Sequence, residues 1–342
     1  MRFFLLVGSL FFIGALSAHA QTAPTLHVAV LEQESFVAVG GEKDGAAGLF
    51  RRVADTTWTH LGWANTRNFG LDAIPSEPGS IFLACGNGVL RTLDNGASWK
   101  VTTDWKMTEV LDVAVDPNAQ THVYAATAYG VWRSPDKGAT WTEINSGIPS
   151  PRSTFTQTIA VDRQQAGRLI VGSEGGLFLT TSGGTEWTSV GPEEIAIRDI
   201  TQSEADPQLW FAGTEENGVV QSQDGGKTWS FVDAEEMKTI YVVDVDPLDA
   251  DHVAAAGFEG GVYVSEDGGE TWRQVGLGDH RVHALAFDPR EPGRLWAGTL
   301  GEGVFYTGSH QDWRYGGLDG AVIRGMEFFD VPSTNNGADD AS

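Results

Sequence analysis

The hydrophobic residues of this chain recur in short runs that alternate with polar residues, which is the pattern of β-strands. From Arg281 to Phe287 apolar and polar side chains alternate, and the run stops at Asp288-Pro289, a pair that ends strands and opens turns. Three further short runs follow at residues 294–298, at 303–307 and from Trp313 onward, with short glycine-rich turns between them. The pattern therefore predicts a unit of four short antiparallel strands.

This unit recurs along the chain. Each copy ends near a tryptophan, and successive tryptophans of the series lie 41 to 46 residues apart. The members of the series are Trp58, Trp99, Trp141, Trp187, Trp229, Trp272 and Trp313. A period of this size with four strands in each unit indicates propeller blades. The sequence predicts an all-β fold, a single seven-bladed β-propeller of four-stranded antiparallel blades that spans residues 21–332.

A short polar turn precedes most of these tryptophans. At the end of a third strand, an aspartate can accept backbone N–H bonds within the turn, and the tryptophan buries apolar surface between blades. We interpret the residues of these turns as structural and assign no catalysis to them. The well-formed turns contain Thr92, Asp94 and Trp99, then Ser134, Asp136 and Trp141, then Ser222, Asp224 and Trp229, and finally Ser265, Asp267 and Trp272.

These turns resemble the Asp-box, or BNR, repeat with the motif Ser-x-Asp-x-Gly-x-x-Trp, and the resemblance covers nearly the whole chain after residue 20. The family includes sialidases, xyloglucanases, sortilin-type receptors and photosystem assembly factors, so the repeat implies a fold and leaves the activity open. In propellers generally, the first strand of each blade lines the central channel. Ligands usually bind at the face where these strands start, and the Asp-box turns lie on the opposite side.

The two ends of the chain indicate how the ring closes. Residues 321–329 read as another first strand, although no further blade follows, and residues 26–30 are strand-like just before 35–40. We expect the C-terminal strand to join the blade begun by the N-terminus, so that ring closure joins the two ends. The polar tail 333–342 is expected to be disordered.

The first 20 residues have the form of a secretory signal peptide. Arg2 precedes an apolar run over residues 3–15, and Ala18-His19-Ala20 is a small-x-small cleavage site. We expect cleavage after Ala20 and a secreted or periplasmic protein. No membrane insertion is expected, because no later apolar run is long enough to span a bilayer. The single cysteine, Cys85, permits no intramolecular disulfide.

The charge of the chain narrows the choice of partners. Acidic residues number 46 against 22 Lys and Arg, for a formal net charge of −24. A surface of this charge repels nucleic-acid phosphates and anionic lipids. It fits a cationic protein or a neutral glycan, and it equally fits an adaptation to solubility in a salty habitat. We predict a protein or carbohydrate partner and no nucleic acid.

One position of the first strands is unusually polar. Its neighbours are mostly Val, Ile, Leu and Ala, and burying polar groups without partners is costly. The polar side chains at this position therefore either line a solvated channel or form a ligand site. Aligning the strands on their Asp-Pro ends places Phe69, Leu111, Gln157, Arg198, Tyr241, His283 and Arg324 in this column.

Several loop residues are expected at the same face. Trp63 and Trp105 fall in loops that enter a blade, and Tyr129 falls in a turn on that face. These aromatic rings either pack over the blades or stack on sugars and partner side chains. Turn acids are either solvated surface groups or part of a mixed-charge pocket at the channel mouth. They are Glu174, Glu215, Glu216, Glu259 and Glu302.

The resemblance leaves an enzyme possible. A sialidase requires an arginine triad, a Tyr–Glu pair and an acidic aspartate, for which the candidates are Arg198, Arg324, Tyr241 and Asp199. The chain lacks an Arg-Ile-Pro segment before its repeats and has seven predicted blades, where sialidases have six. Xyloglucanases are more similar in their repeats, but they place a cleft between two propellers. A carboxylate pair, Asp199 with Asp112 or Asp244, could act as acid and base at a suitable separation.

No other catalytic signature occurs in the sequence. It contains no nucleophile elbow, no His-Glu-x-x-His and no phosphate-binding loop. His280 and His283 are the only closely spaced histidines and a weak indication of a metal, so we predict no metal site and no cofactor. We expect an exported, non-catalytic propeller that binds a protein or glycan through its ring face. The alternative is a glycoside hydrolase of the sialidase or xyloglucanase type, and the oligomeric state is left open.

Overall fold

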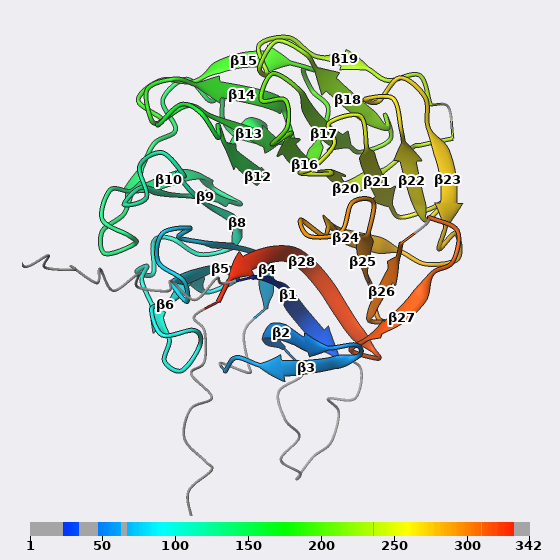
Figure 1. The fold of residues 1–342 in the computed structure, drawn as a ribbon. Helices are drawn as coiled ribbons and strands as arrows, with labels where there is room; N and C mark the ends of the chain where they lie inside the picture. Colours follow the sequence, from blue (N-terminus) through cyan, green and yellow to red (C-terminus); the bar gives the residue numbers. More distant parts are fainter. Residues whose placement is uncertain (1–22, 34–46, 63–66, 235, 309, 332–342) are drawn as a thin grey trace, which may run out of the picture.

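Seven four-stranded antiparallel sheets surround a central channel (Figure 1). The computed structural model describes residues 23–33, 47–62, 67–234, 236–308 and 310–331. The predicted all-β, seven-bladed fold is confirmed. The expected signal peptide, the strand-like segment 35–40, Trp63 and the tail 333–342 lie outside the described residues. Within the described ranges, no helix has the length and hydrophobicity needed to cross a membrane.

Six blades each use four consecutive strands, which follow one another from the channel outward. Blade 1 is the exception and is described below. Blade 2 contains β4 (Asn68–Ala73), β5 (Ile81–Cys85), β6 (Gly88–Thr92) and β7 (Lys100–Val101). Blade 3 contains β8 (Val110–Val115), β9 (Val123–Thr127), β10 (Gly130–Ser134) and β11 (Thr142–Glu143). Blade 4 follows a 3-10 turn, η2 (Arg152–Thr154), and contains β12 (Thr156–Val161), β13 (Leu169–Ser173), β14 (Gly176–Thr180) and β15 (Thr188–Gly191).

The remaining consecutive blades follow the same order. Blade 5 contains β16 (Ile197–Gln202), β17 (Trp210–Thr214), β18 (Val219–Ser222) and β19 (Ser230–Phe231). Blade 6 contains β20 (Ile240–Val245), β21 (Val253–Gly257), β22 (Val262–Ser265) and β23 (Arg273–Gly276). Blade 7 contains β24 (Val282–Phe287), β25 (Leu295–Thr299), β26 (Val304–Thr307) and β27 (Arg314–Gly317).

Blade 1 is built from both ends of the chain. Its innermost strand is β28 (Ala321–Asp330), which pairs antiparallel with β1 (Pro24–Gln33), and β2 (Gly48–Ala54) and β3 (Thr57–His60) complete the sheet (Figure 1). The pairing runs from Pro24 opposite Asp330 to Gln33 opposite Ala321. The segments expected at 26–30 and 321–329 thus lie side by side in one sheet.

The hydrophobic core lies between neighbouring blades. Buried side chains of blade 6, such as Val242 and Val264, pack against Leu285, Phe287 and Leu295 of blade 7, and each of the other interfaces has a similar cluster. Burying about 100 Å² of such surface contributes roughly 2.5 kcal/mol. The fold is therefore held together by interfaces around a ring and has no single central core.

Five of the seven repeat tryptophans donate their indole N–H to the preceding blade, whereas Trp229 and Trp272 donate to a glycine carbonyl of their own turn. The indole N–H of Trp58 donates to the Gly316 carbonyl at 2.9 Å, and that of Trp99 donates to the Leu61 carbonyl at 2.7 Å. Since Gly316 belongs to blade 7, Trp58 joins the last interface of the ring. These hydrogen bonds agree with the prediction from the sequence that the tryptophan rings lie between blades.

The Asp-box turns have the predicted hydrogen bonds. In blade 5 the Asp224 carboxylate accepts the backbone N–H groups of Lys227 and Thr228, both at 3.0 Å, and the Thr228 hydroxyl at 2.7 Å. Ser222, the last residue of β18, donates its hydroxyl to Asp224 and accepts the Gly226 N–H. The carboxylates of the other three well-formed boxes accept the corresponding amide and hydroxyl groups.

These bonds also fix the charge of the turn. Desolvation opposes ionisation of Asp224, but the bonds from Thr228 outweigh it and lower the pKa of this carboxyl to about 2. A carboxyl whose pKa is lower in the folded chain stabilises the fold above its unfolded value near 4. That stabilisation is lost only as the pH falls toward 2.

Asp224→Ala should lower the melting temperature by about 2–4 °C, because the amides of Lys227 and Thr228 lose their acceptor. Scanning calorimetry at pH 7 measures the change. Asp279→Ala is the matched control, since Asp279 is an exposed turn aspartate outside the boxes. Equal melting temperatures for the two variants would contradict the structural role of the box.

Candidate functional site

A β-bulge near the start of each innermost strand sets the side chains at the channel mouth. The ladder to the second strand skips one residue in every blade, for example between Ile197 and Asp199 or between Ile240 and Val242. A bulge turns the skipped residue out of the ladder and re-aims its side chain. The skipped residues are Phe69, Leu111, Gln157, Arg198, Tyr241, His283 and Arg324.

All seven skipped residues line one cavity, the central channel, which has a volume of about 960 Å³. The polar column of the sequence alignment is therefore the column of bulged residues. We call the side of the ring where these strands start the ring face and the opposite side the Asp-box face. The turns between second and third strands lie at the ring face, because Glu174 of such a turn contacts Gln157 and Arg198.

Arg198 is neutralised by neighbouring glutamates. Its guanidinium lies 3.4 Å from Glu174 and forms a second ion pair with Glu215. The Gln157 amide donates to the same Glu174 carboxylate at 2.7 Å. Two of the turn acids, Glu174 and Glu215, thus lie against the column of bulged residues, which agrees with a mixed-charge pocket at the channel mouth. Both form ion pairs with Arg198, so this guanidinium already has acidic partners.

Tyr241 and His283 form a stacked pair beside this cluster. Their ring centroids are 3.9 Å apart with an angle of 20° between the planes. Burial, together with the nearby charges of Arg324 and Arg198, lowers the pKa of His283 to about 2, so this imidazole is neutral. The pair presents a flat, uncharged aromatic surface to the channel.

Arg324 has no acidic partner among the described residues. Its guanidinium lies 5.8 Å from the centre of the Phe69 ring, a cation–π distance. The side chain is half-buried at the mouth. A positive charge in such a position favours a ligand that carries an anionic group.

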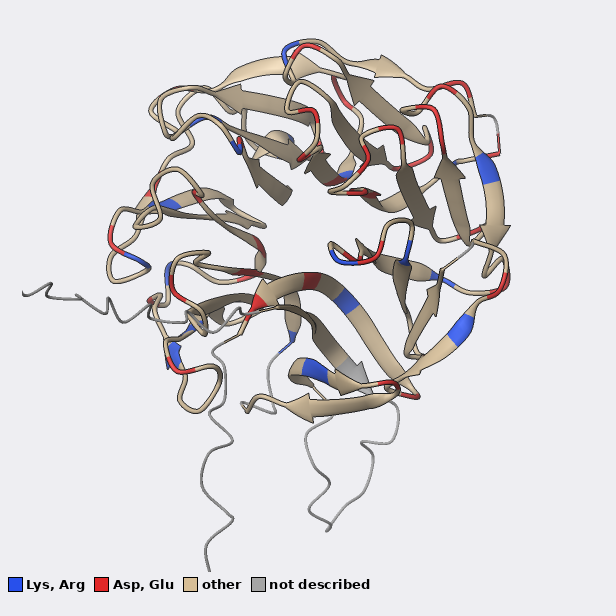
Figure 2. Cartoon of the chain, in the orientation of Figure 1, with Lys and Arg blue, Asp and Glu red and all other residues tan. Residues whose placement is uncertain are grey.

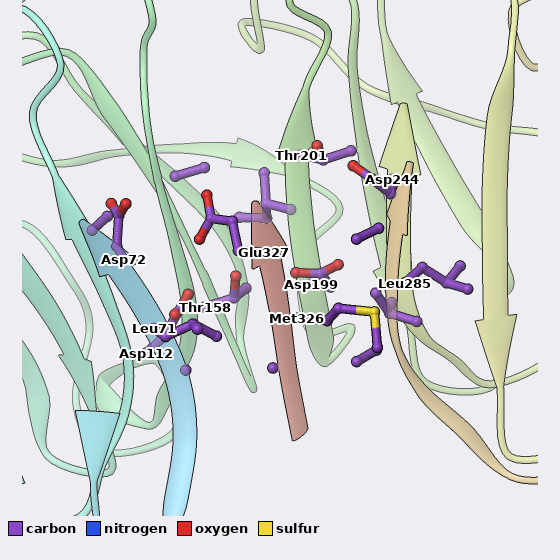
Figure 3. A pocket seen from close by; sticks show the side chains of 18 of the residues that line it. Leu71, Asp72, Asp112, Thr158, Asp199, Thr201, Asp244, Leu285, Met326 and Glu327 are labelled. Carbon is purple, nitrogen blue, oxygen red and sulfur yellow. The ribbon is translucent and has the colours of Figure 1, made fainter. Parts of the chain in front are cut away.

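Deeper in the channel, four aspartates connect neighbouring blades. Each carboxylate accepts the backbone N–H of an innermost strand in the next blade. Asp199 does so from Val243 at 2.8 Å, and Asp112 from Ile159 at 3.0 Å. Asp72 and Asp244 accept from Val115 and Phe287, at 2.6 and 2.8 Å. Figure 3 shows these carboxylates around the channel together with Glu327.

The channel environment opposes ionisation of these acids. Burial raises the pKa of Asp112 and Asp244 to about 7, with a further contribution from the charge of Asp199. Burial also raises the pKa of Asp72 and Asp199 to about 6. The pKa of Glu327 is raised well above its usual value by burial and by the charges of Asp72, Asp112 and Asp244. The acids therefore repel one another across the channel.

Exposed aromatic side chains lie on loops of the ring face. Trp105, at the tip of the β7–β8 loop, is 82% exposed, and Tyr129, in the β9–β10 turn, is 63% exposed. Phe155 and Phe258, on loops of the same face, are 38% and 39% exposed. These exposed fractions contradict the interpretation in which Trp105 and Tyr129 pack over the blade tops.

The other predicted residues have separate environments. Glu259 lies on the exposed β21–β22 turn, and the Glu302 carboxylate lies 2.7 Å from Nε2 of His280. His280 thus pairs with a glutamate while His283 stacks on Tyr241. The two histidines therefore have different partners, and no contact among the described residues joins them to a common group.

Sequence reasoning missed two features. Asp72 and Glu327 occupy the same strand position as Asp244, so an aligned column could have revealed them. The group best placed to hold a metal, His252, Glu266 and His310, comes from three different turns on the Asp-box face. No local spacing in the sequence signals that group.

Comparison with known proteins supports the fold. No protein-family model and no curated protein sequence matches the chain. Among solved structures, the GH74 enzyme of Niastella koreensis aligns with a TM-score of 0.66 at 16% identity, over 90% of this chain and 54% of that one. The GH74 xyloglucanase of Xanthomonas campestris gives 0.65 at 17% identity, over 91% and 53%.

A third similar structure is YCF48 bound to a D1 peptide, with a TM-score of 0.58 at 14% identity, over 78% of this chain and 93% of that one. At these identities the similarity establishes the propeller architecture alone. This chain spans about half the length of the GH74 enzymes and aligns with nearly all of the YCF48 chain.

Proposed function

We propose that this chain is an exported, non-catalytic propeller that binds a carboxylate-bearing segment of a protein partner across the mouth of its ring face. The observation that carries the proposal is Arg324, a half-buried guanidinium at the mouth without an acidic partner among the described residues. A carboxylate of the partner would satisfy it through charge-assisted hydrogen bonds. The Tyr241–His283 stack beside it offers an apolar surface for a neighbouring side chain.

The exposed rings are suited to anchor such a segment. Trp105 projects from a tight turn in which Lys106 N–H donates to the Asp104 carboxylate at 2.9 Å and Met107 is buried beneath. Tyr129 N–H donates to the Thr127 hydroxyl at 3.0 Å, which fixes the second turn. Aromatic rings held in place lose little conformational entropy on binding and are frequent hot spots.

The charge distribution supports binding at the mouth. Acidic residues occur on loops around the ring (Figure 2), and the acids inside the channel repel a carboxylate. Arg324 is therefore where an anionic group of the partner can bind. The rest of the segment should be neutral or basic, because the chain has a net charge of −24.

The channel aspartates argue against hydrolysis. Asp199, the first catalytic candidate, accepts the Val243 amide of the next blade, and Asp112 and Asp244 have equivalent bonds. A general acid or base must be free to exchange a proton with a substrate. Arg198 is likewise occupied, by Glu174 and Glu215, which leaves no arginine triad to grip a carboxylate.

A glycoside hydrolase remains the second candidate because of two observations. The chain has the fold of GH74 enzymes over 90% of its length, and Glu327 is a channel acid for which the described residues supply no hydrogen bond. A carboxyl with a raised pKa can serve as a general acid. Release of reducing sugar from xyloglucan or a sialylated glycan, abolished by Glu327→Gln, would replace the proposal with this alternative.

Selection of a displayed peptide library on the full chain should yield carboxylate-containing ligands. Replacing their carboxylates with amides should weaken binding at least tenfold for the wild type and have little further effect on Arg324→Gln. Such a coupling in a double-mutant cycle identifies a direct contact. Selected ligands whose amides bind equally well would contradict the role of Arg324.

Trp105→Ala combined with Tyr129→Ala should weaken the same peptides by more than tenfold and leave the melting temperature unchanged. The matched control is Leu93→Ala with Leu248→Ala, which removes side chains of 56% and 51% exposure from turns on the Asp-box face. Isothermal titration measures the affinities. A glycan array in which the aromatic variant loses binding, with no peptide selected, would show the partner to be carbohydrate instead.

Stability should decrease as the pH rises from 5.5 to 8. Between about pH 4 and 7 the folded chain holds protons on Asp72, Asp112, Asp199 and Asp244 that the unfolded chain has lost, so deprotonation favours unfolding. The lowered pKa values of the buried imidazoles of His27 and His283 act in the opposite direction below about pH 6.5. We therefore expect a wild-type melting temperature only about 1–2 °C higher at pH 5.5 than at pH 8. Asp112→Asn should reduce this difference and Asp279→Asn should not. An unchanged difference in Asp112→Asn would argue that Asp112 keeps its usual pKa.

A further inference from the structure

Three potential metal ligands converge on the Asp-box face, away from the ring face. His252 lies in the turn before β21, Glu266 in the Asp-box turn of blade 6, and His310 in the corresponding turn of blade 7. One ligand atom from each residue lies within 4.8 Å of those of the other two. The group therefore straddles the interface between two neighbouring blades.

Both imidazoles have an unsatisfied buried nitrogen. The Nε2 atoms of His252 and His310 are buried and have no hydrogen-bond partner among the residues that the structure describes. His310 is 6% exposed and the side chain of His252 is 12% exposed. Their ring centroids are 4.6 Å apart at an angle of 69°. A buried nitrogen without a partner costs free energy, and coordination to a metal ion is one way to satisfy it.

A second carboxylate orients His252. Asp246 Oδ2 lies 3.6 Å from His252 Nδ1, and Asp246 is itself fixed by the backbone N–H groups of Leu248 and Gly293, each at 2.9 Å. A proton held on Nδ1 toward Asp246 leaves the lone pair on Nε2. Histidine ligands of metals commonly have such a carboxylate behind them.

Gly293 lies beside both imidazoles. A side chain there would begin 3.4 Å from Cε1 of His252 and 4.0 Å from Cε1 of His310, which are ordinary van der Waals distances. Its positive φ of 71° is what favours glycine at this position. Glu266 closes the outer side, and its carboxylate contacts Arg273 through Oε1 at 2.5 Å, which leaves Oε2 for a ligand role.

We propose that His252, Glu266 and His310 form a binding site for a divalent transition-metal ion of the zinc class. Two imidazoles and one carboxylate suit such ions, whereas calcium and magnesium require mostly oxygen ligands. Tetrahedral zinc places its ligand atoms about 3.3 Å apart, so the three groups must draw together. The exposed side chain of Glu266 can make most of this movement, and the fourth position opens to solvent.

The bound ion would cross-link blades 6 and 7. His252 and Glu266 belong to blade 6 and His310 to blade 7, so the metal adds a bond to an interface already joined by side-chain packing and by the hydrogen bonds of Asp244 and Asp246 to Phe287 and Gly293. The site is independent of the proposed function at the ring face.

The test uses the full chain after chelator treatment and dialysis. Titration with Zn²⁺ should show one tight site per chain and raise the melting temperature by several degrees. Co²⁺ should give the visible absorption of a low-coordinate site. His252→Ala and His310→Ala should each weaken zinc binding by at least tenfold, and Glu266→Gln should weaken it similarly without affecting the metal-free melting temperature.

His122→Ala provides the matched control. His122 occupies the same position before β9 of blade 3 as His252 does before β21, with valine following in both cases. It should retain the wild-type affinity. Absence of a stoichiometric site in the wild type, or undiminished zinc binding in Glu266→Gln and in His252→Ala with His310→Ala, would overturn the proposal.

Discussion

The structure depends on contacts between sheets that share no backbone ladder. Each blade is a separate four-stranded sheet, and most of the interactions that join one blade to the next involve a side chain. They include apolar clusters, indole N–H bonds such as that of Trp58 to Gly316, and carboxylates such as Asp199 that accept an amide of the next strand. Between blades 7 and 1, the backbone N–H groups of Gly301 and Gly303 also donate to the Ala321 carbonyl. Blade 1 adds the one place where a backbone ladder, between β1 and β28, joins the two ends of the chain.

The same constraint explains the charge of the channel. An aspartate on an innermost strand can reach an amide of the next innermost strand only from the channel side, where water is limited and other acids face it. The hydrogen bonds favour the charged carboxylate, while burial and mutual repulsion raise the pKa of Asp112 and Asp244 to about 7. The channel thus combines acids that hold the ring together with a mouth where Arg324 carries a positive charge without an acidic partner among the described residues.

The sequence predicted the repeats because each repeat carries its own local signal. A tryptophan period and an alternating strand are readable within one unit, and the bulged column appeared once strands were aligned on Asp-Pro. Contacts that involve loops or that join residues of different repeats were harder to predict from the sequence. Asp199 and Val243 are 44 residues apart, close to one repeat, so this bond could have been inferred from the period. The ion pair of Arg198 with Glu215 depends on loop conformation, and the exposure of Trp105 depends on a turn, so neither has a sequence signal.

The turn that follows β26 in blade 7 takes the place of a box turn, but the sequence has serine where the well-formed boxes have aspartate, two residues after Thr307. In an intact box a glycine takes the left-handed conformation, as Gly226 does with φ of 77°. Blade 7 is one residue shorter between Thr307 and Trp313, and there His310 takes the left-handed conformation with φ of 57°. Histidine is one of the residues other than glycine that tolerate this region, and Asn95 and Lys137 of the well-formed boxes take it as well. The turn directs the imidazole inward against His252 rather than toward solvent. The turn of blade 7 therefore contains a buried imidazole nitrogen of His310 that needs a partner from outside the turn. In the well-formed boxes, an aspartate instead forms bonds that stay within the turn. A bound metal ion would supply the partner that His310 needs.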